Sequence, residues 1–398
     1  MKNKNKTAIF YAYSNNSLDH LAPYVFLCHK KKIRCLLIYG EDFISRKVFP
    51  NTKIVKIFKS NKIEIYNIPF FEKKGFIKTI FYFVWLWVGI IEYKKYIPNY
   101  LKIKLKGLCV RLYNRIDGNL IGKNIAKNLL RKNNNFFVFT DSCISKKIKN
   151  SFLFKIRNHA KIITTGHGVW QQKRKSQKGI FVEDIAILMN KWEAISKNYL
   201  KTKEIIGCLR FSKNWIKILD QYSFENKNIL NKKKNIIVLM SPPHITKDWK
   251  KMLNTLVKLI SIQGINVIIL PHHRGMSSSE PPEELKKNWY KDLTLNEAIK
   301  KSHIVISWGS TGIFEAAVRG KKILYLSFLD LDLNKKNYLW INKVSKNIIM
   351  KNEFELLDAV NNYRVNNTLD NDGFKKIIWP YKDPWIKASN FLDKTFNL

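Results

Sequence analysis

Short apolar runs alternate with amphipathic stretches along most of the chain, and polar turns separate them. In the first half, apolar runs cover 7–13, 33–40, 136–142 and 161–168, with helical patterns between them. The succession strand, loop, helix, strand defines a βαβ unit, and continuously apolar strands are typical of a parallel sheet covered on both faces. We therefore predict an α/β domain over residues 1–211.

The same alternation resumes after a polar, lysine-rich tract. That tract ends the segment 212–234, which we interpret as a linker that also contains one helix. Over 235–370, apolar runs again alternate with helical patterns, which predicts a second α/β domain of the same Rossmann-like kind. The segment 371–398 has the pattern of a terminal helix, and we expect it to return to the first domain.

One segment does not fit the α/β alternation. Residues 79–91 are strongly apolar and aromatic, with lysines on both sides. These thirteen residues would rise only about 20 Å as a helix, too short for a hydrocarbon core of about 30 Å. The segment is either a buried core helix or a monotopic element with aromatic rings at headgroup level. The basic, aromatic stretch that follows favours the second reading, so we expect a membrane-proximal insertion over 73–106.

The chain is strongly basic, with 72 Lys and Arg against 30 Asp and Glu and a formal net charge of +42. The chain is also rich in Asn and Ile, and Lys, Asn and Ile together are the residues that an AT-rich genome encodes at unconstrained surface positions. The charge is therefore weak evidence for a nucleic-acid partner, and no nucleic-acid-binding motif is present. An anionic membrane surface or a phosphate-bearing substrate fits the charge better. We therefore expect no nucleic acid among the partners.

The five cysteines are scattered, without a CxxC pair or a histidine at zinc-finger spacing. This pattern argues against a disulfide framework and against a structural zinc site, and it fits a reducing compartment. The first apolar run spans only seven residues and is better explained by a strand than by a signal peptide. The expected location is the cytoplasm, peripheral on the inner face of the cytoplasmic membrane.

The most informative motif, SWGSTGIFE, spans the end of an apolar strand and the start of a helix. Ligands of parallel sheets bind outside the carboxyl ends of strands, and small residues there leave backbone N–H groups free for a phosphate. The glutamate lies one turn into the helix, in a position to accept hydrogen bonds from ribose hydroxyls. An ordinary capped helix is the alternative. We assign binding of a phosphate-bearing, nucleotide-type ligand to Ser307, Gly309, Ser310, Thr311 and Glu315.

A second group of polar residues ends the strand over 265–270. His272, His273 and Arg274 supply three potential phosphate donors, and we expect this strand to lie next to the GST turn in the sheet. Ser241, at the end of the first strand of the second domain, belongs to the same rim.

Candidate general bases come from the first domain. His167 follows an apolar strand and is flanked by two glycines, which let the imidazole approach a ligand closely. Asp141 ends another strand on the same rim and is the alternative base, and His20 is a third candidate. We expect His20, Arg210 and Ser241 to lie at the interface of the two domains or, in an enzyme that transfers a group, on the side that binds the acceptor.

Several familiar signatures are absent from the sequence: a Walker A loop, GxGxxG at a first βα turn, a GxSxG elbow and a DxD motif. These absences disfavour P-loop hydrolysis, a dinucleotide-binding first domain, serine hydrolysis and metal-dependent single-domain glycosyl transfer.

Four segments within 161–327 resemble enzymes of bacterial surface-polysaccharide biosynthesis. HGVWQQKRKSQKG resembles the His-Gly segment of the CDP-glycerol glycerophosphotransferase and capsule polysaccharide transferase group. GCLRFSKNW resembles the Gly-x-x-Arg-Phe-x-x-x-Trp segment that ends the first domain of such proteins, and LPHHRG stands at their His-Pro strand end. SWGSTGIFEAAVRGKKILYL resembles their Ser-Ser/Thr turn, helix glutamate and Gly-Lys-Pro strand. His273 and Lys322 stand where the family carries proline.

The resemblance implies a GT-B architecture, with two Rossmann-like domains facing across a cleft. It carries donor binding onto His272, Ser310, Thr311 and Glu315, and it makes His167 the leading candidate for the base. It also implies a nucleotide-sugar co-substrate and no bound cofactor or metal. The expected reaction is transfer of a sugar to a hydroxyl of a surface-glycan acceptor, and a lipid-linked acceptor would explain the insertion.

Three alternatives remain open. A CDP-polyol phosphotransferase would use the same fold and residues to attack phosphorus. A nucleotide-sugar 2-epimerase would share the architecture without a membrane patch. A non-catalytic, basic membrane- or polyanion-binding protein would bind no nucleotide and would show steep salt dependence.

Overall fold

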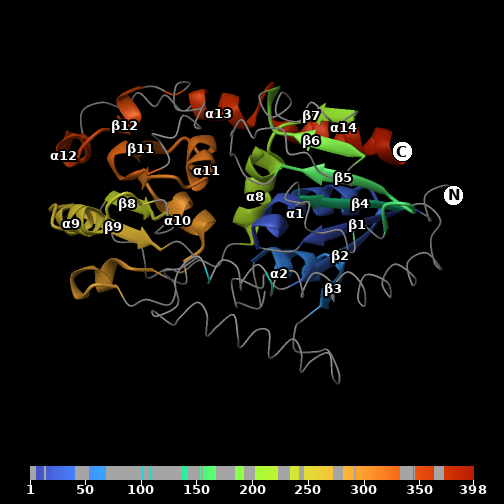
Figure 1. Cartoon of the computed structure of the whole chain (residues 1–398), viewed down its shortest axis with the longest axis horizontal. Coiled ribbons are helices and arrows are strands. Elements are labelled where there is room, and N and C mark those ends of the chain that lie inside the picture. The colour runs from blue at the N-terminus through green and yellow to red at the C-terminus, as the bar shows by residue number, and fades with distance from the viewer. Residues whose placement is uncertain are drawn as a thin grey trace, which may run out of the picture.

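The fold consists of two parallel sheets, each covered by helices, joined through a compact junction (Figure 1). This computed structural model confirms the predicted α/β class and its two Rossmann-like units. The structure describes residues 6–12, 15–40, 53–68, 101, 108, 136–141, 153, 156–166, 184–191, 202–222, 234–241, 246–271, 281–290, 293–331, 344, 346–362 and 372–398.

The N-terminal sheet has the strand order β3-β2-β1-β4-β5-β6-β7 within the described residues, and each of its pairings is parallel. The order reverses between β1 and β4, as in a doubly wound sheet. Its strands are β1 (Thr7–Ala12), β2 (Arg34–Gly40), β3 (Glu64–Ile68), β4 (Phe136–Asp141), β5 (Lys161–Thr165), β6 (Ile185–Leu188) and β7 (Thr202–Ile205).

The C-terminal sheet has the order β12-β11-β10-β8-β9 and reverses between β8 and β10. A parallel bridge from Ile269 to Trp289 adds a short extended stretch beyond β9, so both sheets follow the same winding scheme. Its strands are β8 (Lys234–Leu239), β9 (Ile265–Leu270), β10 (Ile304–Ser307), β11 (Lys322–Leu326) and β12 (Ile349–Met350).

Helices cover both sheets because one stripe of each helix is apolar. In the N-terminal unit Phe10 and Phe139 stack at 4.9 Å between ring centroids beneath α1, and Phe396 of the last helix stacks on Phe139 at 6.5 Å. The described helices are α1 (Asn15–Lys30), α2 (Lys53–Ser60), α8 (Lys213–Gln221), α9 (Trp249–Ile260), α10 (Leu295–Lys301), α11 (Gly312–Val318), α12 (Glu353–Asn361), α13 (Asp372–Ile378) and α14 (Pro384–Phe396).

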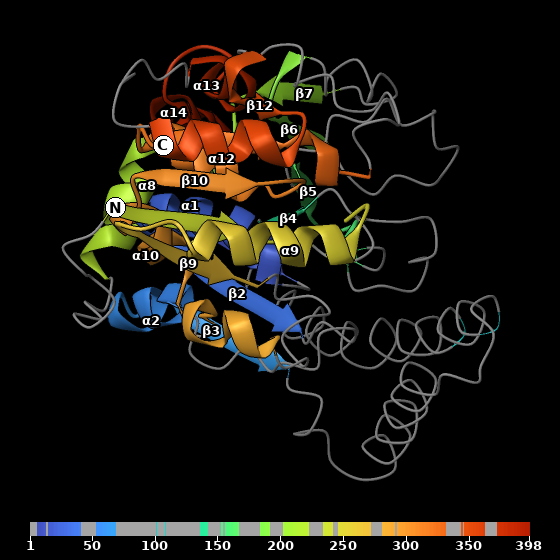
Figure 2. The same cartoon turned by 90° about the vertical axis from the view of Figure 1, so that its left-hand side faces the viewer.

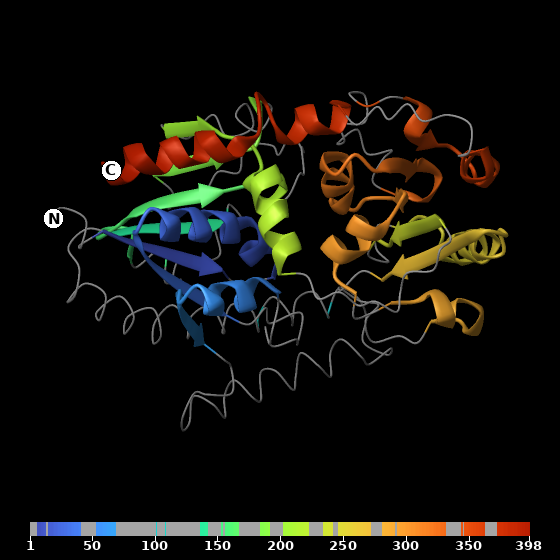
Figure 3. The ribbon, with the colours of Figure 1, turned by 180° about the vertical axis from the view of Figure 1, so that it is seen from behind.

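The C-terminal segment consists of two helices that pack on different units. Phe374 of α13 meets Phe314 of α11 edge-on at 5.7 Å, whereas α14 lies against α1 in the N-terminal core. Figure 3 shows α13 at the junction and α14 crossing the N-terminal unit. One backbone and one side-chain hydrogen bond close the junction: Cys208 N donates to Ile378 O at 2.8 Å, and Asn190 Nδ2 donates to Ile377 O at 3.2 Å.

Two features differ from the pattern-based expectation. The polar stretch after β1 is not a turn, because α1 already begins at Asn15, which places His20 inside the helix. In addition, α2 and β3, which were not predicted, extend the sheet at one edge. The segment 79–91 lies outside the described residues, and none of the described helices is long and apolar enough to cross a bilayer.

Candidate functional site

The two units turn the carboxyl ends of their strands toward the junction from opposite sides (Figure 3). In such sheets ligands bind where the strand order reverses. On the C-terminal side this point lies between Ser241, which follows β8, and the turn Gly309–Thr311, which follows β10. On the N-terminal side it lies between β1 and β4, and Asp141 is the last residue of β4.

Hydrogen bonds to neighbouring strands fix the backbone of the turn Gly309–Thr311. Ser307 Oγ donates to Leu239 O at 3.2 Å and so ties β10 to β8. Gly309 has φ +62°, a left-handed conformation that favours glycine, and its N–H donates to Tyr325 Oη at 3.1 Å. The Tyr325 hydroxyl in turn donates to the buried carboxylate of Asp330. The backbone of the turn therefore has a fixed position.

The two hydroxyls of the turn differ in their bonding. Ser310 Oγ accepts from Gly312 N at 3.2 Å, which leaves its own proton for another acceptor. Thr311, at the N-cap of α11, makes no capping bond with its side chain. Both residues are half-buried. Their hydroxyls are thus placed to donate to an anionic group at the junction.

Three buried hydroxyls near the strand ends lack a hydrogen-bond partner within the described part of the chain. They belong to Ser241 in the C-terminal unit and to Thr164 and Thr165 at the end of β5 in the N-terminal unit. Orphaned buried hydroxyls are uncommon in folded proteins and call for a water or a ligand. Both sides of the junction therefore carry unused hydrogen-bonding capacity.

Glu315 takes part in a network that crosses the junction. Its Oε1 accepts from Asn296 Nδ2 and from Arg319 Nε, both at 3.1 Å. Arg319 Nη1 and Nη2 donate to Asp220 Oδ2 and Oδ1 at 2.9 and 2.7 Å. Asp220 lies on α8, whose Trp215 packs in the N-terminal core. We call Asp220, Asn296, Glu315 and Arg319 the junction network.

The junction also perturbs the titration of its carboxylates. Burial alone would raise the pKa of Asp220, but the hydrogen bonds and charge of Arg319 outweigh burial, and this pKa lies below its usual value. Burial raises the pKa of Asp19 on α1; Arg210, 3.0 Å away, opposes this rise and Glu315 adds to it. Arg210 thus pairs with Asp19 next to the carboxylate that enters from the other unit.

His20 reaches the end of β5. Together with Thr165, Gly166 and Cys208 it lines a pocket of about 20 Å³, enough for about one water molecule. Tyr24, one turn further along α1, lines the same pocket, and burial raises its pKa. The structure therefore brings His20 to the residues that directly precede position 167.

His167, His272, His273 and Arg274 lie outside the described residues. The strand that precedes the last three is placed, however, and it corrects the expected order. β8 lies between β9 and β10, because the chain crosses to the far side of β8 before it returns, so β9 does not end next to the GST turn (Figure 2).

Pattern reading missed Asp220, Asn296 and Arg319. The spacing of Glu315 and Arg319 by four positions on one helix does predict an ion pair. No local signal marks Asp220, which is 99 positions from Arg319. Among the described residues no group of three or more acidic, histidine or cysteine side chains is placed to hold a metal ion.

The fold of this chain is similar to that of known enzymes. No family model and no curated protein matches this chain. Among solved structures, the UDP-GlcNAc 2-epimerase of Methanocaldococcus jannaschii is 11% identical over 98% of this chain and 99% of its own, with a TM-score of 0.56. A structure of that enzyme contains UDP-GlcNAc and UDP.

Two further solved structures, of a glycosyltransferase and of a polymerase, have a similar fold. The glycosyltransferase of kitacinnamycin is 9% identical over 99% of both chains, with a TM-score of 0.57. The wall teichoic acid polymerase TagF, solved after a soak with CDPG, is 10% identical over 99% of this chain and 88% of its own, with a TM-score of 0.53. This chain therefore has the GT-B-type fold over its whole length.

Proposed function

We propose that this protein is a GT-B-type glycosyltransferase that moves a sugar from a nucleotide-activated donor to a hydroxyl of a surface glycan. The observation that carries the proposal is the meeting of two reversal points at one junction, with buried hydroxyls after β8 in one unit and at the end of β5, next to β4, in the other that have no partner in the described chain. The likeness to enzymes whose names include UDP-GlcNAc, glycosyl transfer and teichoic acid polymerisation supports a nucleotide-bearing ligand.

On the donor side, the N–H groups and hydroxyls of the turn Gly309–Thr311 would hold the diphosphate, with Ser241 opposite. Both described hydrogen bonds to Glu315 end on Oε1, so Oε2 remains to accept from a ribose hydroxyl. The side chains of 272–274 would add positive charge to the leaving group. Preorganised donors of this kind stabilise charge where it develops, so the proposed mechanism needs no bound metal.

On the acceptor side, His167 or Asp141 would take the proton of the acceptor hydroxyl. The oxygen then attacks the anomeric carbon, the bond from that carbon to the phosphate oxygen breaks, and the nucleoside diphosphate leaves with the bonding electrons. His20 lies beside Thr165 in the small pocket and would orient the acceptor or the base. A lipid-linked acceptor at the cytoplasmic face of the membrane would suit the net charge of +42 and the insertion over 73–106.

The test is a thermal-shift panel with UDP, CDP, CMP and GDP. A ligand that binds only the native state stabilises it by mass action and so raises the melting temperature. At a ligand concentration of 100 times the dissociation constant, the free energy of unfolding increases by about 2.7 kcal/mol. We expect one nucleotide to stabilise the wild type and to lose most of this effect in the double variant Ser310→Ala/Thr311→Ala. Ser261→Ala, an exposed serine at the end of α9, is the matched control. Absence of a shift with every nucleotide would contradict the proposal and favour a non-catalytic, polyanion-binding protein.

Two other activities have a specific observation in their favour, and products separate them. The likeness to TagF favours a CDP-polyol phosphotransferase, which would release CMP instead of a nucleoside diphosphate. The likeness to the epimerase favours inversion at C2 of the sugar, which needs no acceptor. Nucleotide-sugar incubated with and without acceptor, followed by chromatography of the nucleotides, distinguishes the three.

A further inference from the structure

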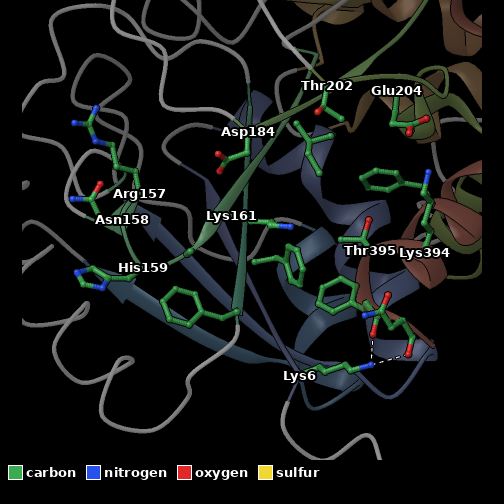
Figure 4. A pocket seen from close by; sticks show the side chains of 17 residues that line it. Lys6, Arg157, Asn158, His159, Lys161, Asp184, Thr202, Glu204, Lys394 and Thr395 are labelled. Atoms are coloured by element: carbon green, nitrogen blue, oxygen red, sulfur yellow. Dashed lines mark hydrogen bonds between the residues drawn. The ribbon is translucent and has the colours of Figure 1, made fainter.

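A large cavity lies at the edge of the N-terminal sheet that faces away from the junction. Its volume is about 700 Å³, within the usual range for small-ligand pockets of about 300–1,000 Å³. Phe136, Lys161, Ile185 and Thr202, the first residues of β4, β5, β6 and β7, line one side of it. The last turn of α14 lines the other side (Figure 4). This cavity is therefore separate from the site at the carboxyl ends of the strands.

The floor of the cavity is aromatic and belongs to the core. Phe136, Phe391 and Phe396 are only 3%, 8% and 1% exposed, and all three line the cavity. The ring of Phe137 meets that of Phe396 edge-on, with 4.7 Å between centroids. These rings are fixed by packing, so the apolar floor exists before any ligand arrives.

The rim is polar and carries an excess of positive charge. Lys6, Arg157, Lys161 and Lys394 line it together with only two carboxylates, those of Asp184 and Glu204. Figure 4 shows Arg157 and His159 on one side, Lys394 and Thr395 on the other, and Lys161 between them.

Part of this charge is already engaged. Lys6 Nζ donates to the carbonyls of Phe396 and Asn397 at the end of α14. Asp184 Oδ2 accepts from Ile162 N at 2.7 Å, which holds that carboxylate against the sheet edge. The side-chain ammonium groups of Lys161 and Lys394 make no hydrogen bond or ion pair with the described residues. These two ammonium groups, on opposite walls, remain for an anion.

We propose that this cavity binds an anionic amphiphile, a phosphate monoester with an aliphatic chain. The phenylalanine floor would bury the chain, and Lys161 and Lys394 would hold the phosphate between the walls. An apolar body requires the floor and an anionic head requires the rim, so neither a bare anion nor a neutral hydrocarbon uses the whole site. The proposal does not depend on the activity assigned to the junction.

The probe is octyl phosphate, titrated calorimetrically into the full-length protein. Each buried methylene contributes about fourfold in affinity. Even if only two of its extra methylenes are buried, octyl phosphate should bind at least about tenfold more tightly than butyl phosphate or inorganic phosphate. Octanol should bind more weakly than octyl phosphate because it lacks the charge. Saturating UDP or CDP should leave the affinity unchanged, because the two sites lie at opposite edges of the sheet.

Three variants test the residues. Lys161→Glu/Lys394→Glu should weaken octyl phosphate at least about tenfold, as expected for the loss of two ammonium groups and the gain of two like charges. Thr202→Trp, an exposed residue on the rim, should weaken binding by filling the space without removing a described bond. Lys387→Glu, on the same helix but next to Tyr381 and outside the cavity, should bind as the wild type does.

Four results would overturn the proposal: equal binding of octyl and inorganic phosphate, equal loss in Lys387→Glu, competition by nucleotide, or tighter binding of AMP than of octyl phosphate. The first two would mean nonspecific attraction to a basic protein. The third would move the ligand to the junction, and the last would assign the floor to a nucleobase. Failure here leaves the nucleotide panel on the turn Gly309–Thr311 unaffected, so the two proposals fail separately.

Discussion

Replacing Arg319 with methionine should destabilise the protein more than any exposed arginine change of the same kind. Arg319 donates three hydrogen bonds to two carboxylates, at 2.7, 2.9 and 3.1 Å. Its side chain is 10% exposed, and those of Glu315 and Asp220 are 7% and 24% exposed. Methionine keeps most of the apolar stem but leaves both carboxylates without their cation.

The size of the effect follows from this burial. Removing one partner of a buried ion pair costs about 3–5 kcal/mol, because an uncompensated charge stays behind. Glu315 keeps its bond from Asn296, and Asp220 is partly solvated, so we expect the lower end, about 3 kcal/mol. Asp220→Ala should cost about 2 kcal/mol, and the two changes should couple by about 2 kcal/mol in a double-mutant cycle.

The assay is urea unfolding of the four proteins of the cycle, with the midpoint and slope compared. Arg34→Met is the matched control, because Arg34 also donates two hydrogen bonds to one carboxylate, from Nε and Nη2 to Glu64 at 3.1 and 3.0 Å, but on an exposed surface. It should cost less than about 1 kcal/mol. Equal losses for Arg319→Met and Arg34→Met would refute the reasoning from burial.

The pH dependence of the stability loss in Arg319→Met gives a second test of the role of charge. The pKa of Asp220 is lower in the folded protein than its unfolded value of 3.8. Its contribution to stability is therefore complete above that value and is lost as the pH falls through the folded pKa. The penalty of Arg319→Met should thus shrink between pH 7 and pH 3. A constant penalty would mean that methionine acts by packing and not by the loss of charge.

The remaining predictions concern the junction and the turn. Gly207→Ala should cost about 2–3 kcal/mol in urea unfolding, because φ is +110° and a Cβ would lie 3.0 Å from a backbone carbonyl, whereas Gly320→Ala, at φ +69° in open space, should cost about 1 kcal/mol. Tyr325→Phe removes the acceptor of Gly309 N–H and should lower the melting temperature and weaken any nucleotide found in the panel, and an unchanged nucleotide shift would separate the turn from the site. Asp19 has a raised pKa in the folded protein, so its ionised form destabilises the native state at neutral pH, and this penalty disappears as the pH falls through the folded pKa. Asp19→Asn should therefore be at least as stable as the wild type at pH 7 and lose that advantage in acid; lower stability of Asp19→Asn at pH 7 would show that its pairing with Arg210 dominates.

The sequence alone was enough for the class of fold and for the GST turn. Strands buried on both faces need continuous apolar runs, and β8 and β10 show them at positions 236–239 and 304–306. A sharp turn with a left-handed residue favours glycine, so Gly309 marks the end of β10. These features depend on interactions between close neighbours along the chain, which is why they could be predicted. α2 and β3 carry the same kind of local signal, although they were not predicted.

Only the tertiary structure decided which strand ends meet. The place of β9 on the far side of β8 depends on where each crossover returns, and the apolar pattern of a strand is the same on either side. The start of α1 at Asn15, and with it the approach of His20 to Thr165, depends on packing against β1 and β4. The pairing of Asp220 with Arg319 depends on how two separately wound units dock, because their side chains meet across 99 positions of chain with no local pattern in common.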